Sequence, residues 1–242
     1  MSTPEPQIPR RKGHAQRLFE LPPDATEVLL VRHGASAAAY EDEPFALNAE
    51  GHGDPPLSDE GREQAELVGI RLAEERLAGL YVTSLQRTHQ TAAPLAERSG
   101  QTPVEIPDLR EVHLGEWEAG EYRARIAAAD PLAIRVFTEQ RWDLIPGAES
   151  NETLGERVRR GFDRVVADAG PGVSVAAFVH GGVIAELCHQ ATKSEPFAFL
   201  GADNTSISRL VVFGDGRLRM RTFNDTTHLD PIRARQAHEP IV

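Results

Sequence analysis

Two apolar runs, each ending abruptly at a histidine, constrain what this chain can fold into. Residues 28–31 lead directly into Arg32 and His33, and residues 173–179 lead directly into His180. Apolar runs of this length are typical of central β-strands that are buried on both faces. The chain is therefore expected to build a sheet with helices on both sides, with a histidine at the end of two of its strands.

The rest of the chain alternates between predicted strands and predicted helices. Further strands are expected at 77–82, 104–106, 206–213 and 218–223, and helices at 61–75, 88–99, 153–168 and 183–190. Ser58 is a suitable N-cap for the first helix, and residues 122–142 are expected to be helical with an interruption at Pro131. Residues 214–216 should join the last two strands as an antiparallel pair. This order predicts a three-layer α/β/α fold with a mostly parallel central sheet.

Length and composition favour one large domain. The chain has 242 residues, of which 40% are hydrophobic, which is enough for one substantial core. Residues 1–25 are polar and rich in proline, and we expect them to form an extension that is disordered or packed on the surface. The domain proper is expected at 26–230, with a C-terminal tail at 231–242.

Charge and cysteine content exclude several classes of protein. A net charge of −11 argues against non-specific binding to nucleic acids or anionic membranes, because both need basic surface. No apolar run approaches the roughly 20 residues of a membrane span. The single cysteine, Cys188, rules out an intramolecular disulfide, is expected to be a buried small hydrophobe, and suits a reducing, cytoplasmic location. There is no Walker motif and no dinucleotide-binding glycine motif after a strand.

Three predicted strands end in residues that suit an anion. Arg32 and His33 follow the first strand, Thr83 with Arg87 close behind follows the second, and His180 follows the fourth. Ligands of open α/β sheets bind outside the carboxyl ends of the strands. Arginine grips phosphate oxygens in pairs, glycine such as Gly34 lets the backbone approach a ligand, and N–H groups at a helix start, as at Gly181, attract anions. The sequence therefore predicts a phosphate site at this edge of the sheet.

Other interpretations of the same residues stay open at this point. His33 and His180 could each be structural core histidines, Arg87 a surface ion-pair partner, and Glu111 a solvated acid rather than a proton donor with a raised pKa. A metal site could be built from four histidines, namely His33, His52, His113 and His180. Their separations do not match the close spacing of common zinc motifs, so we expect no metal.

The motifs resemble those of a known family. They are Val31-Arg32-His33-Gly34, Asp54 to Ser58 with Gly61, Gln64 and Ala65, Ser84 to Thr88 with Gln90 to Ala92, Glu111 with Gly115 to Glu118, Gly147 to Ser150, His180 to Gly182, Asn204 to Ser206, and His228-Leu229. In order and spacing this set, over residues 28–229, resembles the histidine phosphatase superfamily, in the branch that includes cofactor-dependent phosphoglycerate mutases.

The resemblance implies roles for individual residues. His33 would attack phosphorus and become phosphohistidine, Glu111 would serve as the proton donor and then as the base, and His180 would complete the catalytic set. Arg32, Arg87 and His180 would bind the phosphate oxygens, with Ser36 and Gly181 as further phosphate contacts. The resemblance implies no metal and no cofactor, and it leaves a homodimer open.

The chain departs from the family pattern just after His33. Ala35 and Ser36 stand where the family usually has Glu-Thr, and Ala39 stands where it usually has Asn. Ser36 can still donate a hydrogen bond, whereas Ala39 removes one usual phosphate contact. The following loop is longer than usual and carries three acids at 41–43. If these acids faced the site they would repel polyanionic substrates.

The resemblance favours hydrolysis of a small phosphorylated metabolite. A long basic insert typical of the mutases is missing after the Glu111 motif, and Glu149-Ser150 resembles the phosphatase loop. Phosphoglycerate mutase activity and a catalytically impaired binding protein are the alternatives. Leaving-group recognition falls to residues 40–53 and 122–146, where Phe137 and Trp142 could line an apolar lid or belong to the core.

Overall fold

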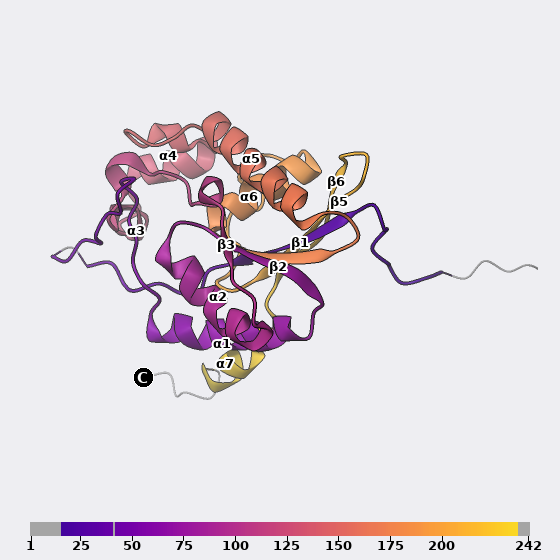
Figure 1. The fold of residues 1–242 in the computed structure, drawn as a ribbon. Helices are drawn as coiled ribbons and strands as arrows, with labels where there is room; N and C mark the ends of the chain where they lie inside the picture. Colours follow the sequence, from indigo (N-terminus) through magenta and orange to yellow (C-terminus); the bar gives the residue numbers. More distant parts are fainter. Residues whose placement is uncertain (1–15, 41, 237–242) are drawn as a thin grey trace, which may run out of the picture.

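The computed structural model describes residues 16–40 and 42–236, and its centre is a six-stranded sheet (Figure 1). The strands are β1 (Thr26–Arg32), β2 (Leu77–Val82), β3 (Val104–Glu105), β4 (Ser174–Val179), β5 (Ile207–Val212) and β6 (Leu218–Asp225), in the spatial order β3-β2-β4-β1-β5-β6. Neighbours from β3 to β1 are parallel, whereas β5 and β6 join antiparallel. The prediction of a mostly parallel sheet is confirmed.

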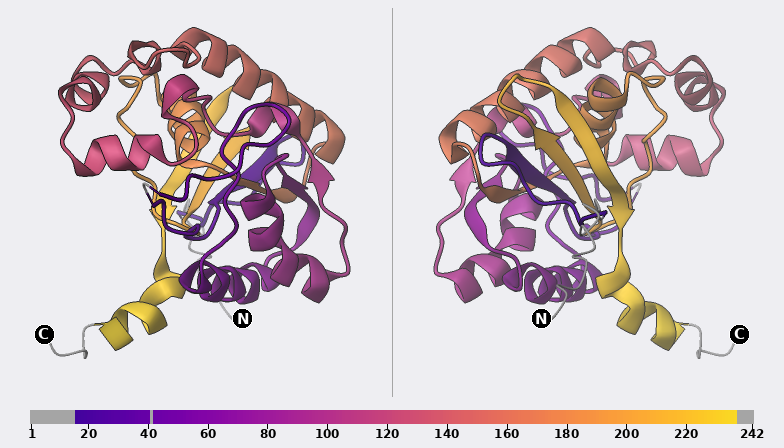
Figure 2. Two further views of the ribbon diagram at one scale, coloured as in Figure 1. Left: turned by 90° about the vertical axis from the view of Figure 1, so that its left-hand side faces the viewer. Right: turned by 90° about the vertical axis from the view of Figure 1, so that its right-hand side faces the viewer.

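Helices cover both faces of the sheet, which gives the molecule three layers (Figures 1 and 2). One face carries α1 (Asp59–Ala73) and α2 (Gln86–Ser99), and the other carries α5 (Asn151–Ala169) and α6 (Gly181–Thr192). Strand β1 serves both layers, because side chains alternate across a strand. Leu29 and Val31 pack in the core of the first face, and Val28 and Leu30 in that of the second. All four side chains are fully buried.

The segment that was expected to be one interrupted helix forms two. Helix α3 spans Glu121–Ala127 and α4 spans Pro131–Glu139, followed by the short 3-10 turn η3 (Trp142–Leu144). Proline at the first position of a helix has a suitable backbone angle and lacks only an N–H that would be unpaired there. Asp130 caps this start by accepting a hydrogen bond from the Leu132 N–H at 2.7 Å. Pro131 therefore begins a helix.

The start of α1 fixes the loop that follows β1. Ser58 Oγ accepts a hydrogen bond from the Gly61 N–H at 3.0 Å, which confirms Ser58 as the N-cap. A Cβ atom on Gly61 would lie 1.9 Å from the Ala35 carbonyl oxygen, and one on Gly34 would lie 2.5 Å from the Gly61 carbonyl oxygen. Gly34 thus admits the backbone of α1, whereas its sequence context suggested that it admits a ligand.

The chain ends are described in part. Residues 1–15 of the expected extension and 237–242 of the expected tail lie outside the described residues. Residues 16–25 lead into β1, and the Arg221 guanidinium of β6 lies 3.5 Å from the ring centre of Phe19. The expected tail begins as helix α7 (Asp230–Gln236), which follows the 3-10 turn η4 (Thr227–Leu229) (Figure 2). Among the described residues, no helix has the length and apolarity needed to cross a membrane.

Candidate active site

The two strand-end histidines lie side by side. Strands β1 and β4 are parallel neighbours with Arg32 opposite Val179, so His33 and His180 leave the sheet together. The His33 N–H donates to the Val179 carbonyl at 2.9 Å. The centres of the two imidazole rings are 5.2 Å apart, with the ring planes at 60°. The structure thus brings together two residues separated by more than half of the chain.

His33 presents one free ring nitrogen. Its Nδ1 atom lies 2.8 Å from the Gly34 carbonyl oxygen. A carbonyl only accepts hydrogen bonds, so Nδ1 carries the hydrogen and Nε2 keeps its lone pair. Burial, reinforced by the positive charges of Arg87 and Arg32, lowers the pKa of His33 well below its usual value. The imidazole is therefore neutral at neutral pH, which is the form that can attack phosphorus.

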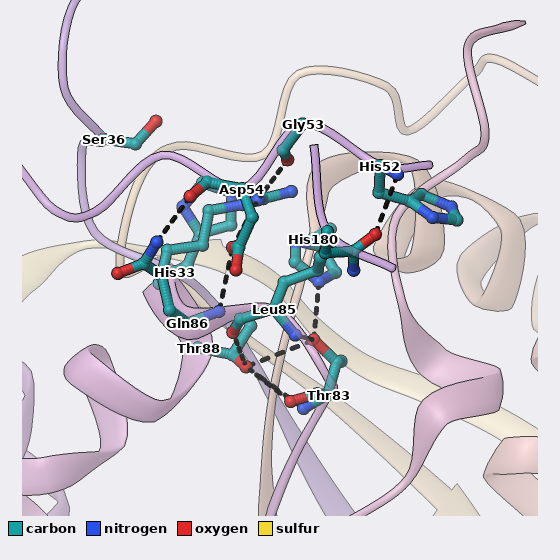
Figure 3. A network of polar contacts seen from close by, with 12 residues as sticks. His33, Ser36, His52, Gly53, Asp54, Thr83, Leu85, Gln86, Thr88 and His180 are labelled. Carbon is teal, nitrogen blue, oxygen red and sulfur yellow. Dashed lines mark hydrogen bonds and ion pairs between the residues drawn. The ribbon is translucent and has the colours of Figure 1, made fainter. Parts of the chain in front are cut away.

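Thr83, which follows strand β2, supports His180. The Thr83 hydroxyl lies 3.0 Å from Nε2 of His180 (Figure 3). His180 is fully buried, and its Nδ1 atom has no hydrogen-bond partner within the described chain. Burial, with the charge of Arg87 next, lowers the pKa of His180 well below its usual value. Nδ1 is thus the atom that a ligand beside His33 can use.

A cavity of about 440 Å³ opens beside His33 at the carboxyl ends of the strands, and Arg32, Arg87, Glu111 and Gly181 are among its lining residues. Arg32 Nη1 donates to the Ala202 carbonyl at 2.5 Å, while its buried Nε has no partner among the described residues. Burial lowers the pKa of the guanidinium groups of Arg32 and Arg87 from their ordinary value, although arginine stays charged in proteins.

Arg87 is held against the loop that precedes α1. Its Nη1 atom donates to the Gly53 carbonyl at 3.1 Å and lies 3.7 Å from Oδ1 of Asp54. Figure 3 shows Asp54 in turn bonded to Gln86, the first residue of α2. Only 7% of Arg87 is exposed, so its charge lies in a site of low polarity where an anion would be held strongly.

Glu111 sits at the N-terminus of α6. The Gly182 N–H lies 3.1 Å and 3.3 Å from the two carboxylate oxygens, and the Val112 N–H donates to Oε1 at 3.0 Å. A Cβ atom on Gly182 would lie 2.6 Å from Oε1, so any larger residue here would displace the carboxylate from this position. The sequence suggested that these helix-start N–H groups bind phosphate. Gly182 holds the carboxylate, while Gly181 lines the cavity.

Glu149, in the loop 147–150, acts on Glu111 through Arg157, a residue that was not predicted from the sequence. Arg157 is 6% exposed and pairs with Glu149 at 2.5 Å. It also donates to the carbonyls of Asp108, Arg110 and Glu111 at 2.8, 2.9 and 3.3 Å. The pair therefore fixes the backbone that carries Glu111. A lone arginine within a helix pattern offers no sequence signal for this role.

Ser36 stands behind Arg123 and is not among the residues that line the cavity. Its hydroxyl accepts a hydrogen bond from Nη2 of Arg123 at 2.6 Å, and Nη1 donates to the Ala37 carbonyl at 2.8 Å. Arg123 itself lines the cavity and lies over the ring of Phe45, 5.1 Å from its centre. Arg123 was not predicted from the sequence, because residues 121–127 carry no clear periodicity. Gly120 leaves room for Ala39, because a Cβ atom on Gly120 would lie 2.9 Å from that of Ala39.

Other residues singled out in the sequence lie around this centre. His52 lines the cavity and is 3% exposed, and its ring lies 4.8 Å from that of His113. The described residues contain no group of three or more side chains suited to a metal ion. Glu41 lies outside the described residues, and its neighbours Asp42 and Glu43 are exposed and do not line the cavity.

Cys188 is a buried residue of the core, as expected. Burial raises the pKa of its thiol to about 12, so it is not a nucleophile.

Fold and site together define an α/β protein with a cationic, histidine-containing anion site at the carboxyl edge of its sheet. The histidine phosphatase superfamily (branch 1) matches residues 28–226, and the chain belongs to this family. It is 31% identical over 211 residues to phosphoglycerate mutase-like protein 4 of Arabidopsis thaliana, covering 86% of this chain and 88% of that one.

Relatives named as phosphatases are also similar. Glucosyl-3-phosphoglycerate phosphatase of Mycolicibacterium vanbaalenii is 32% identical over 167 residues, which cover 66% of this chain and 71% of that one. The solved structure of a mycobacterial glucosyl-3-phosphoglycerate phosphatase superposes with a TM-score of 0.68 at 26% identity, covering 84% of this chain and all of the other. Alignments with several other relatives span only 55% to 61% of those proteins.

Proposed function

We propose that this protein is a phosphomonoester hydrolase that acts on a small phosphorylated metabolite through a phosphohistidine at His33. The observation that carries the proposal is the free Nε2 of a neutral His33 beside the cations Arg32 and Arg87, which line the same cavity. A neutral imidazole is a nucleophile, and fixed cations stabilise the charge on a transferring phosphoryl group.

The reaction has two displacements. In the first, His33 Nε2 forms a bond to phosphorus as the ester P–O bond breaks, and Glu111 gives its proton to the leaving alkoxide. In the second, Glu111 takes a proton from water, whose oxygen bonds to phosphorus as the N–P bond breaks and phosphate leaves. Arg32, Arg87 and Nδ1 of His180 bind the non-bridging oxygens in both steps. Ser36 supports the phosphate indirectly by holding Arg123, and Gly181, which lines the cavity, contacts the phosphate directly.

Hydrolysis is favoured over mutase chemistry by the small number of cations in the cavity. A mutase must hold the carboxylate of a phosphoglycerate as well as its phosphate. Arg123 is the cavity cation that would be left for this carboxylate, and it is already bonded to Ser36 and Ala37. The relatives named as phosphatases support the same choice. A binding protein without catalysis is disfavoured because His33, Arg87, Glu111 and His180 are all present.

Hydrolysis of p-nitrophenyl phosphate tests the proposal directly. His33→Ala should lower kcat by at least about 10³-fold, because the nucleophile is lost. Acid quenching with a ³²P-labelled substrate should trap label on His33 of the wild-type enzyme. Equal rates for the wild type and His33→Ala, or the absence of label on any histidine, would contradict the phosphohistidine mechanism.

Further features of the proposal follow from composition. We expect a metal-independent reaction, since the arginines supply the positive charge, so chelators should leave turnover unchanged. A lone buried cysteine supports a cytoplasmic location, and the net charge of −11 supports the absence of nucleic-acid partners. Whether the protein is a homodimer is a question for light scattering.

A further inference from the structure

The cavity has an apolar part beyond its phosphate end. Six large hydrophobic side chains line it: Phe45, Leu114, Trp117, Phe137, Trp142 and Leu200. Phe45 comes from the loop before α1, and Leu114 and Trp117 come from the 3-10 turn η2 (Gly115–Trp117) and the residue before it. Phe137 lies in α4, Trp142 in η3 and Leu200 in the segment after α6. A wall of this kind gains free energy by covering apolar ligand surface, at roughly 25 cal/mol per Å².

The apolar wall is built in advance. Trp142 lies 4.7 Å from the ring centre of Phe197, and Phe137 lies 6.3 Å from the same ring. On the other side, Tyr122 lies 6.3 Å from Trp142 and 6.4 Å from Trp117. Rings that support one another in this way keep their places, so an apolar ligand would meet a preformed surface.

The charged groups of the wall are occupied. Glu118 accepts hydrogen bonds from the Gly53 N–H at 2.7 Å and the Leu114 N–H at 2.9 Å. Arg123 keeps its positive charge, because its partners, the Ser36 hydroxyl and the Ala37 carbonyl, are neutral, but the proposed function assigns this charge to the phosphate. Burial lowers the pKa of His52 to about 4, so this histidine adds no positive charge at neutral pH. Within the described part of the wall, a second anionic group on the substrate would meet no uncommitted cation.

We infer that the substrate is a phosphomonoester whose leaving group is an uncharged, apolar or aromatic alcohol. The inference rests on the proposed function, which assigns the phosphoryl group to the end with Arg32 and Arg87. The leaving group then lies against the six apolar side chains. A phosphorylated acid or a polyol phosphate would leave that wall wet or bury polar groups without partners, which costs affinity.

The test compares benzyl phosphate with glycerol 3-phosphate, because both release a primary alkoxide and make similar demands on Glu111. The wild-type kcat/KM should favour benzyl phosphate by about 100-fold. Phe137→Ala should lower this ratio by about tenfold. Phe137 is 42% exposed, so the variant should fold. The matched control is Ile134→Ala on the same helix, at a position that is 55% exposed and outside the cavity, and it should keep the wild-type ratio.

Binding of benzylphosphonate and methylphosphonate by calorimetry separates this inference from the proposed function, because neither compound is hydrolysed. Tighter binding of benzylphosphonate than of methylphosphonate, weakened in Phe137→Ala but not in Ile134→Ala, supports the inference even if neither ester is turned over. A lack of turnover would overturn only the proposal that the protein is a hydrolase. Equal binding of the two phosphonates, or kcat/KM values that favour glycerol 3-phosphate, would overturn the inference and leave the hydrolase intact.

Discussion

Thr83 Oγ1 and His180 Nε2 lie 3.0 Å apart in a fully buried contact. Because the Thr88 hydroxyl donates to the Leu85 carbonyl at 2.8 Å, the Thr83 hydroxyl has two acceptors in reach, Nε2 of His180 at 3.0 Å and the Thr88 oxygen at 3.2 Å. The contact to Nε2 is the shorter of the two. Because the pKa of His180 is lowered, the neutral ring can donate to a phosphate oxygen through Nδ1 only when Nε2 accepts. Thr83 is therefore a positioning residue that selects the useful tautomer.

Replacing this hydroxyl should weaken phosphate binding. Thr83→Val leaves Nε2 buried without a partner, a cost of about 1–3 kcal/mol, so kcat/KM for p-nitrophenyl phosphate should fall about 10- to 100-fold. Thr83→Ser keeps the hydroxyl and should recover most of the activity. The deficit of Thr83→Val should shrink at acidic pH, where a protonated His180 donates through Nδ1 without help. A deficit that is the same in both variants and at every pH would indicate a packing role.

A double-mutant cycle tests how Ser36 acts. Ser36→Ala should lower kcat/KM about threefold, comparable to one lost hydrogen bond, and Arg123→Ala should lower it about tenfold. Since Ser36 bonds to Arg123, its effect should vanish in the Arg123→Ala background. An unchanged effect of Ser36→Ala in that background would instead mean that the serine contacts phosphate itself.

Acid should destabilise the fold through its buried histidines. The pKa of His52 is about 4 in the folded chain and near 6.5 when unfolded, so the unfolded chain binds more protons between these values. The free energy of unfolding should therefore fall as the pH drops from 6.5 to 4, and His33 and His180 act in the same direction. Urea unfolding at several pH values should show a shallower slope in His52→Asn. An equally steep slope in the variant would argue against the shift.

The contact between α1 and the loop after β1 makes replacement of Gly61 more destabilising than replacement of Gly69 in the same helix. Gly61→Ala places a Cβ 1.9 Å from the Ala35 carbonyl oxygen and should cost about 3 kcal/mol of unfolding free energy. Gly69→Ala meets Pro94 Cβ at 3.0 Å, and the gain in helix propensity offsets part of that strain, so its cost should stay near or below about 1 kcal/mol. Thermal melts of both variants check the order, and a reversed order would disprove the close approach.

The sequence predicted the strands more closely than the site. Strands β1, β4, β5 and β6 were expected within a few residues of their bounds, because unbroken or alternating apolar runs report burial directly. The segment that carries α3 and α4 was expected as one interrupted helix, since a proline within a helical pattern can either break a helix or begin one. Arg123 and Arg157 were missed because their roles depend on partners far away in the chain.

By itself, the sequence determined the layered α/β plan and the meeting of Arg32, His33 and His180 at one edge of the sheet. Both follow from local patterns, because parallel neighbouring strands must end on the same side. Only the tertiary structure decided which ring nitrogen of His33 is free, that Gly182 holds Glu111, and that Phe137 and Trp142 face the cavity. These features depend on how loops and helices pack against one another, and residues that meet only through such packing carry no mark in the sequence.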